Sequence, residues 1–335
     1  MNEQTITDTS SSTTAGLSLE QAGKLAEAIT QEIGKAMIGQ QKVVRETLIA
    51  LLAGGHVLIE GVPGLGKTLL VRALAKTISG KFSRIQFTPD LMPADISGHV
   101  LFDMQNQSFQ VRKGPVFTNL LLADEVNRAP AKTQSALLEV MQEQQVTIEG
   151  ESHPVPLPFM ALATQNPLEQ EGTYPLPEAQ LDRFLMKVYI DYPSHAEETQ
   201  LVEAVTNQQV GDGFNLNMLR AIVNPETVIA MQQVTAGIAV DASVTDYAVR
   251  ITQATREGRG LRFGAGPRGS IALIRAARAH ALLEQRDFVH PDDIKQIALP
   301  VLRHRVSLAP EMELEGYNTD YVLKSILEKT EAPRQ

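Results

Sequence analysis

Several residue types and patterns are missing from this 335-residue sequence, and each absence excludes a class of protein. There is no cysteine, so disulfides and thiolate metal sites are impossible and nothing marks an oxidising compartment. No run approaches 18 apolar residues, because glycines and a histidine interrupt the longest candidate, Leu48–Ile59, so no membrane-spanning helix is expected. The histidines show no H-E-x-x-H or other ligand spacing, and G-x-S-x-G is absent, so neither a transition-metal site nor a serine or cysteine nucleophile is predicted.

Positive charge is also scarce, because 30 Lys and Arg face 39 Asp and Glu, for a formal charge of −9. This balance argues against broad binding to nucleic acid, although it leaves room for a local basic groove. Residues 256–278 hold six arginines, which either form a solvated helix face or bind a ligand. Residues 1–16 are rich in Ser and Thr and lack the basic start and apolar stretch of a secretory signal, so we expect a disordered tail and a cytoplasmic protein.

The whole chain has the composition of a globular protein, with 43% hydrophobic residues, and is long enough for two domains. Five apolar runs follow one another along the chain, and helical stretches lie between most of them. This alternation predicts an α/β fold with a parallel five-stranded sheet between helices. The predicted strands are Val57–Ile59, Arg84–Phe87, Leu120–Ala123, Phe159–Ala163 and Met186–Ile190. Residues 98–117 and 145–158 break this alternation and are predicted to be hairpins.

Helical patterns dominate after residue 192, so residues 17–192 are expected to form the core and residues 193–330 a small all-α domain. Ser243 and Asp246 are predicted to form a capping box. Ile271, Ile274, Ala277 and Ala281 have the spacing of a shared helix face.

The strongest chemical signal is the stretch from Gly61 to Thr68, which fits G-x-x-x-x-G-K-[ST]. It follows a predicted strand and precedes a predicted helix, the context in which loop amides and a helix N-terminus bind phosphate. Lys67 would reach the β- and γ-phosphates, and Thr68 would hold Mg²⁺.

Two later strands end in polar residues that suit hydrolysis. Asp124 and Glu125 follow the run Leu120–Ala123, so Asp124 could bind Mg²⁺ and Glu125 could polarise the attacking water. Asn166 follows Phe159–Ala163 and could hold that water or touch the γ-phosphate, although this stretch alone favours a turn cap before Pro167.

Two arginines are candidates for stabilising transition-state charge. Arg183 lies in the Leu-Asp-Arg-Phe stretch, and Arg268 falls at the start of a predicted helix. A guanidinium group stays charged and binds phosphate with two hydrogen bonds. Structural salt bridges remain the alternative for both residues.

Taken together, these motifs resemble the MoxR family of AAA+ ATPases over about residues 17–330. The most specific stretch is residues 169–184, Glu-Gln-Glu-Gly-Thr-Tyr-Pro-Leu-Pro-Glu-Ala-Gln-Leu-Asp-Arg-Phe. The resemblance implies a P-loop AAA+ core followed by a helical lid, with ATP and Mg²⁺ as cofactors. It also implies that the two hairpins are the helix-2 insert and the pre-sensor-1 hairpin, both facing a central pore.

The resemblance further implies the site residues. Asn166 would be sensor 1, and Arg268 would be sensor 2, acting in cis. Arg183 would be the arginine finger that reaches a neighbouring subunit, with Arg128 as its rival, and Gln86 is a possible Glu-switch residue. Thr68 and Asp124 would bind Mg²⁺, with Lys67 and Glu125 in catalysis. Nucleotide would contact Ile38, Gly39, Gly61, Val62, Pro63, Gly64, Leu65, Gly66, Lys67, Thr68, Leu69 and Asp124.

The resemblance therefore implies a ring-forming ATP hydrolase, a homohexamer that remodels or matures a client protein. Many members act with a partner that bears a von Willebrand factor A domain. Two alternatives stay open, a low-turnover scaffold that binds ATP to assemble and a nucleic-acid motor. The intact Glu125 and Arg183 argue against the first, and the acidic balance argues against the second.

Overall fold

A five-stranded parallel sheet lies at the centre of the computed structural model, which describes residues 16–62, 64–166, 172–206, 216–258 and 260–333. The strand order is β2-β5-β8-β1-β9, and every neighbouring pair is parallel. The strands are β1 (Val57–Glu60), β2 (Phe82–Gln86), β5 (Leu120–Asp124), β8 (Met160–Gln165) and β9 (Met186–Tyr189). This arrangement confirms the predicted α/β core.

The three central strands, β5, β8 and β1, are buried on both faces, which explains why they read as nearly continuous apolar runs. Alternate residues of β1, β5 and β8 enter two separate hydrophobic clusters, as the two-residue period of a strand requires. Val57, Ile59, Leu120, Leu122 and Leu162 belong to one cluster, and Leu58, Leu121, Ala123, Ala161 and Ala163 to the other.

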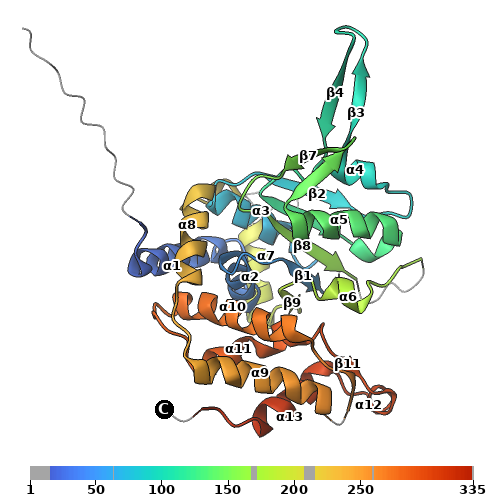
Figure 1. Ribbon diagram of the computed structural model, residues 1–335. Helices are drawn as coiled ribbons and strands as arrows, with labels where there is room; N and C mark the ends of the chain where they lie inside the picture. Colours follow the sequence, from blue (N-terminus) through green and yellow to red (C-terminus); the bar gives the residue numbers. More distant parts are fainter. Residues whose placement is uncertain (1–15, 63, 167–171, 207–215, 259, 334–335) are drawn as a thin grey trace, which may run out of the picture.

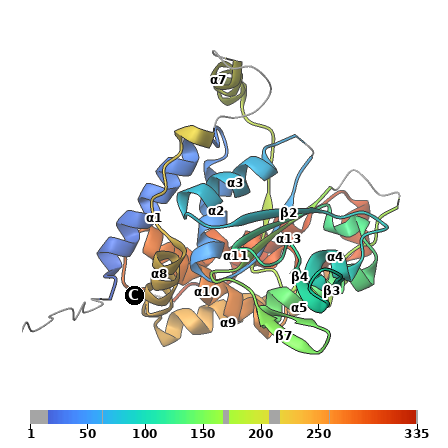
Figure 2. The same ribbon diagram turned by 90° about the horizontal axis from the view of Figure 1, so that it is seen from above.

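Helices cover the two faces unequally (Figures 1 and 2). The larger cluster includes the apolar sides of α1 (Leu19–Gly34), α2 (Gln41–Leu52) and α3 (Lys67–Thr77). The smaller cluster includes the apolar sides of α4 (Pro93–Ser97) and α5 (Ala131–Glu143). The short 3-10 helix η1 (Val126–Arg128) follows β5, and the short helix α6 (Glu178–Leu181) precedes β9.

The two predicted hairpins are present. The first pairs β3 (Gly98–Asp103) with β4 (Ser108–Lys113), and it projects well beyond the rest of the molecule (Figure 1). The second pairs β6 (Gln145–Ile148) with β7 (Glu151–Pro154).

The C-terminal region is helical, as predicted, apart from a short antiparallel ribbon of β10 (Leu261–Phe263) and β11 (Ser307–Leu308). Its helices are α7 (His195–Thr206), η2 (Leu216–Met218), α8 (Pro225–Ala236), α9 (Ala242–Glu257), α10 (Pro267–Leu283), α11 (Pro291–Leu302), α12 (Pro310–Leu314) and α13 (Thr319–Lys329). Among the residues that the structure describes, none of the helices has both the length and the apolar character needed to cross a bilayer. The predicted tail lies outside the described residues except for Gly16, and the boundary at residue 192 stays a prediction.

Two local predictions in this region are wrong. The N-cap of α9 is Asp241, whose side chain accepts a hydrogen bond from the Ser243 backbone N–H at 2.8 Å, so Ser243 does not open a capping box. An acid two residues earlier, Asp241, caps the free amides instead. On α10, Ile271 is 58% exposed rather than buried with Ala277 and Ala281, because α10 docks through a neighbouring face.

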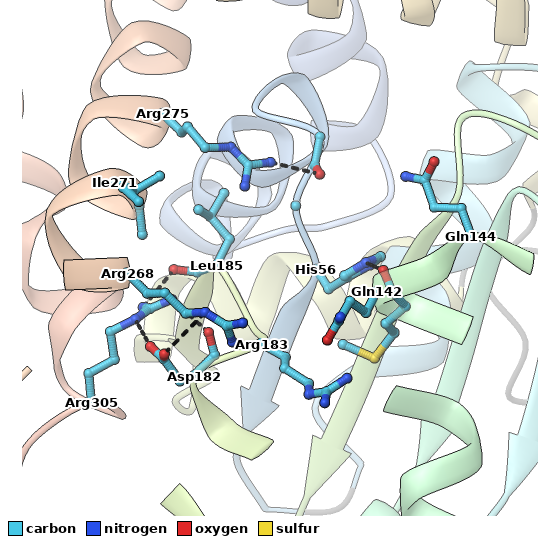
Figure 3. Close-up of a pocket in the computed structure, with 14 residues that line it drawn as sticks. His56, Gln142, Gln144, Asp182, Arg183, Leu185, Arg268, Ile271, Arg275 and Arg305 are labelled. Atoms are coloured by element: carbon cyan, nitrogen blue, oxygen red, sulfur yellow. Dashed lines mark hydrogen bonds and ion pairs between the residues drawn. The ribbon is translucent and has the colours of Figure 1, made fainter. Parts of the chain in front are cut away.

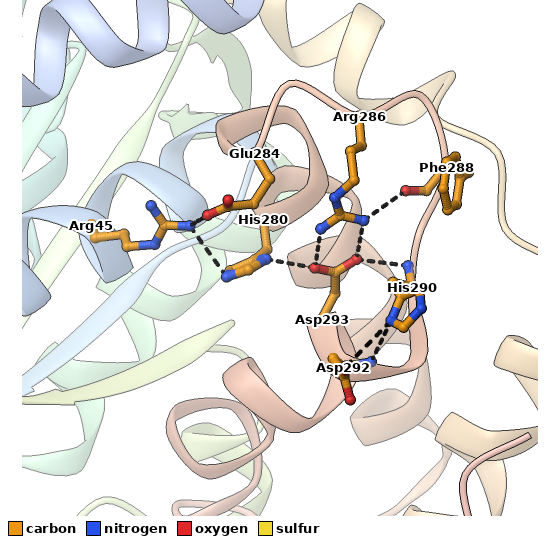
Figure 4. A network of polar contacts seen from close by, with 8 residues as sticks. All are labelled: Arg45, His280, Glu284, Arg286, Phe288, His290, Asp292 and Asp293. Carbon is orange, nitrogen blue, oxygen red and sulfur yellow. Dashed lines mark hydrogen bonds and ion pairs between the residues drawn. The ribbon is translucent and has the colours of Figure 1, made fainter.

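A polar network fastens α10 and α11 to the core helix α2 (Figure 4). Arg45 on α2 forms an ion pair with Glu284 and lies 3.2 Å from His280 Nε2. His280 Nδ1 lies 2.8 Å from buried Asp293, and Arg286 donates to the same carboxylate. These hydrogen bonds outweigh the effect of burial and hold the pKa of Asp293 well below its usual range.

Candidate active site

The phosphate loop, residues 61–68, connects the carboxyl end of β1 to the first turn of α3. Gly66 has φ 82°, a left-handed conformation that favours glycine. At Gly61, a Cβ atom would lie 2.6 Å from the carbonyl oxygen of Ile190, so only glycine fits there. The geometry therefore explains two of the glycines in the motif, while Pro63 lies outside the described residues.

A cavity of about 370 Å³ adjoins this loop. Its predicted lining residues include Ile38, Gly64, Leu65, Gly66, Thr68 and Leu69, and Met37, Arg72, Pro193 and Leu201 join them. Gly39 lies at its edge with φ 75°, close to Pro193 and Glu197. This lining is more apolar than polar, which suits the flat base of a nucleotide.

Asp124 and Glu125 lie at the carboxyl end of β5, next to β8 in the sheet. The Asp124 carboxylate accepts hydrogen bonds from Thr164 Oγ1 and from Arg84 Nη2, both at 2.6 Å. Glu125 Oε2 accepts from Gln86 Nε2 and Arg128 Nη1, both at 2.9 Å. Carboxylate and hydroxyl oxygens are the ligands that Mg²⁺ prefers, so Asp124 together with Thr68 fits the predicted metal.

The backbone of Glu125 is itself unusual. Its φ of 55° and ψ of 50° place a non-glycine residue in the left-handed region, where such residues are uncommon. The Glu125 N–H donates to Thr164 Oγ1 at 2.8 Å, which helps to hold this turn. One threonine thus orients both acids, by donating to Asp124 and accepting from Glu125.

Lys67 and Asn166 lie at the same edge of the sheet. The Lys67 Nζ donates to the carbonyl oxygen of Gly61 at 2.5 Å. Burial lowers the pKa of Lys67, and the nearby charges of Asp124, Glu125 and Glu60 oppose that shift. Asn166 is buried directly after β8. The structure therefore brings the loop lysine, both acids and the asparagine together.

The remaining two site residues lie elsewhere, in what we call the arginine pocket (Figure 3). This cavity of about 420 Å³ is lined by the side chains of Asp182, Arg183, Arg268, Arg275 and Arg305, and by residues 54–56, which directly precede β1. Because residues 61–68 directly follow β1, the two sites lie at opposite ends of the strand. A four-residue strand alone separates them by about 13 Å.

This placement contradicts the expectation that Arg268 acts on the nucleotide of its own chain. Arg268 Nε lies 3.9 Å from Asp182 Oδ2, beside the segment that precedes β9. The helix α10 does begin with Arg268 in its first turn, as predicted, but it points that turn at the amino ends of the strands. By contrast, Arg128 contacts Glu125 in its own chain, at the carboxyl end.

Comparison with known proteins agrees with this architecture. Residues 56–186 match the ATPase family associated with various cellular activities (AAA), and residues 253–326 match the AAA lid domain. Chaperone MoxR1 of Mycobacterium tuberculosis is 43% identical over 312 residues, covering 90% of this chain and 81% of MoxR1. The chain belongs to the MoxR family of AAA+ ATPases.

Two further relatives support membership of the MoxR family. The uncharacterized protein YeaC of Bacillus subtilis is 45% identical over 305 residues, covering 91% of this chain and 94% of YeaC. The crystal structure of a candidate ATPase from Cytophaga hutchinsonii superposes with a TM-score of 0.87 at 42% identity, covering 94% of this chain and 97% of that one. Membership of this family implies nucleotide binding and, in general, ATP hydrolysis.

Sequence reasoning missed several residues that the structure places in these sites. Thr164 directly follows the predicted strand Phe159–Ala163, and a hydroxyl at the end of an apolar run was the available signal. Arg305 follows an apolar helix as part of Arg-His-Arg, but nothing local shows that it meets Asp182 across 123 residues. Arg275 donates to the carbonyl oxygens of Ala53 and Gly54, which links part of the arginine-rich stretch to this pocket.

Proposed function

We propose that this chain is a Mg²⁺-dependent ATPase that assembles into a ring of identical subunits, a hexamer, and cleaves ATP at the contacts between them. The observation that carries the proposal is the separation of the phosphate loop from the arginine pocket by the length of β1. Neither end alone has both the phosphate cradle and the arginines, whereas a head-to-tail contact between two copies would join them.

In the proposed site, the loop amides and Lys67 bind the triphosphate. Thr68 and Asp124 would hold Mg²⁺, which neutralises charge on the phosphates when it is bound. Glu125 would polarise the attacking water, and Asn166 would orient that water or sense the γ-phosphate. The hydrogen bond from Gln86 to Glu125 supports Gln86 as the switch that holds Glu125 away from water until a client binds.

The neighbouring subunit would contribute Arg183 together with Arg268, both to stabilise transition-state charge in trans. An arginine donated in this way is worth about 10³–10⁵ in rate. Arg128 is the weaker candidate, because it already contacts Glu125 of its own chain.

Hydrolysis would move the helical region against the core and so displace the hairpins that contact a client protein. The β3–β4 hairpin supports this role, because Phe102, Met104 and Phe109 are exposed on it. A contiguous apolar patch of this kind is typical of a protein-binding surface. One relative is named a chaperone, which agrees with a client protein. A partner with a von Willebrand factor A domain stays a prediction.

The test is the ATPase rate per subunit as a function of protein concentration, in the wild type and in Arg183→Ala. We expect the rate to rise steeply with concentration as rings form, and Arg183→Ala to lower it by about 10³-fold or more. Arg262→Ala is the control, because it removes an exposed arginine that lies outside the arginine pocket.

Two results would contradict the proposal. A rate that is independent of concentration would mean that one subunit suffices. An Arg183→Ala protein as active as the Arg262→Ala control would mean that no arginine finger acts through this residue. ATP-dependent assembly with negligible turnover would instead identify the scaffold.

A further inference from the structure

The side chain of Arg305, which follows α11, forms several hydrogen bonds to the segment that carries Arg183 (Figure 3). Its Nε donates to Asp182 Oδ1 at 2.8 Å, its Nη2 to the carbonyl oxygen of Phe184 at 2.6 Å, and its Nη1 to that of Leu185 at 3.1 Å. The Arg305 side chain is only 3% exposed. A planar guanidinium can bond several acceptors at once, so these contacts fix the backbone on both sides of Arg183.

Asp182 faces a second arginine as well. Its Oδ1 accepts from Arg305, while its Oδ2 lies 3.9 Å from Arg268 Nε. Among the described residues that line the arginine pocket, Asp182 supplies the one carboxylate. Arg268 is more than half exposed, so its attraction to Asp182 is weak in water. The attraction nevertheless orients the flexible Arg268 side chain towards Asp182.

The buried positive charge of Arg305 is tolerated because its guanidinium N–H groups donate hydrogen bonds. Burial lowers the pKa of Arg305 to about 10, and the carboxylate of Asp182 opposes that shift, so Arg305 remains charged at neutral pH. Removing one partner of a buried, hydrogen-bonded charge pair leaves the other uncompensated, so the contact between Arg305 and Asp182 is costly to break. Arg305 is too buried to touch a nucleotide on a neighbouring subunit, so any effect on the reaction must pass through the residues that it holds.

We propose that Arg305 and Asp182 are positioning residues that hold Arg183 and Arg268 as one unit for the nucleotide of the adjacent subunit. This inference rests on the proposed function and deepens it. Arg183 comes from the core and Arg268 from α10, so without a common anchor their separation would vary with every movement of the helical region. A displacement of about 1 Å in such a pair costs about 10²-fold in rate.

The first experiment measures turnover and the dissociation constant for ATP in Asp182→Asn and Arg305→Lys. Asparagine keeps an acceptor for Arg305 but removes the charge between the two arginines, and lysine keeps the charge but cannot bond Asp182, Phe184 and Leu185 together. We expect turnover to fall about 10- to 100-fold and ATP affinity to stay within about twofold, because the cradle lies at the other end of β1.

The second experiment separates positioning from folding by mixing subunits. Lys67→Ala lacks the cradle but keeps the arginine pocket, whereas Asp182→Asn lacks only the pocket's anchor. At equal mixing, about one contact in four joins an intact cradle to an intact pocket, so activity should return to about a quarter of the wild-type rate. A general loss of stability would not be complemented in this way.

The mixture of Arg183→Ala with Lys67→Ala distinguishes the two proposals. If that mixture stays inactive, the shared site itself is wrong. If it regains activity while the Asp182→Asn mixture does not, the shared site stands and the positioning role is refuted. A folded Asp182→Asn protein with wild-type turnover also refutes the positioning role. An Asp182→Asn protein that fails to fold refutes it too, because Asp182 then serves stability alone. If only Arg305→Lys fails to fold, the result for Asp182→Asn decides.

Discussion

The two ends of the central strands offer two different ways to recognise an anion. At the carboxyl ends, the groups suited to bind an anion are the backbone amides of the phosphate loop and of the start of α3, together with a single lysine. At the amino ends, the candidate groups are the side chains of Arg183 and Arg268, which come from separate stretches of the chain. The first site is built from one continuous segment, the second only by folding. In the proposed function neither end is complete, so triphosphate cleavage is divided between subunits.

The largest effect expected at the carboxyl end is that of removing the general base. Glu125→Gln keeps the size and most hydrogen bonds of the side chain but removes its basicity, so it should bind ATP normally. Its turnover should fall by about 10²–10⁴-fold, the usual contribution of a general base. Single-turnover hydrolysis and ATP titration of the same sample measure both quantities.

Glu328→Gln is the control for Glu125→Gln, since Glu328 is an exposed acid on α13, far along the chain from either site. Equal loss of binding and hydrolysis in Glu125→Gln would refute its assignment as the base. The same protein with ATP is also suited to capture a client, because it should hold the bound state.

The carboxyl end could be predicted because its chemistry is local in sequence. The motif at residues 61–68 lies directly between a strand and a helix, and the acids Asp124 and Glu125 lie at the end of a buried strand. Parallel strands bring their carboxyl ends to one edge, so placing Asn166 there needed only the strand assignments. The five strands and both hairpins were predicted for the same reason, from short-range periodicity.

The amino end could not be predicted, because helix signals do not encode docking direction. Arg268 does lie at the start of a helix, as predicted, yet the sequence did not show where that start points, and so Arg268 was expected beside the phosphate loop of its own chain rather than in the arginine pocket. Ile271 looked like a core residue but lines the arginine pocket instead. The bonds of Arg305 to residues 182–185 depend on the packing of α11 against β9, which no local pattern reports.

The second prediction tests the phosphate cradle through its lysine. Lys67→Ala should weaken ATP binding by about 100-fold, because losing one partner of a desolvated charge pair costs about 2–5 kcal/mol. Calorimetric titration measures this, with Lys324→Ala as the exposed lysine control. An unchanged dissociation constant would remove the phosphate cradle from the account and leave only a glycine-rich turn.

The smallest expected effect concerns His56, at the amino end of β1. Its ring lies between the carbonyl oxygen of Met141, 2.9 Å from Nε2, and the N–H of Ala161, which donates to Nδ1 at 3.0 Å. The second contact requires a neutral Nδ1, so the folded protein resists protonation here. Burial lowers the pKa of His56 from 6.5 to about 4, and the positive charge of Arg275 acts in the same direction.

Because the folded-state pKa is depressed, the unfolded chain takes up a proton first as the pH falls. The stability associated with His56 is therefore fully present above about pH 6.5 and is lost progressively towards pH 4. Between pH 7.5 and pH 5 the wild type should lose about 2 kcal/mol through this residue, and His56→Gln should not. Urea unfolding of both proteins without nucleotide measures the difference. Equal losses would show that the ring is not held neutral, whereas a smaller loss in His56→Gln would place acid sensitivity beside the arginines, away from the phosphate loop.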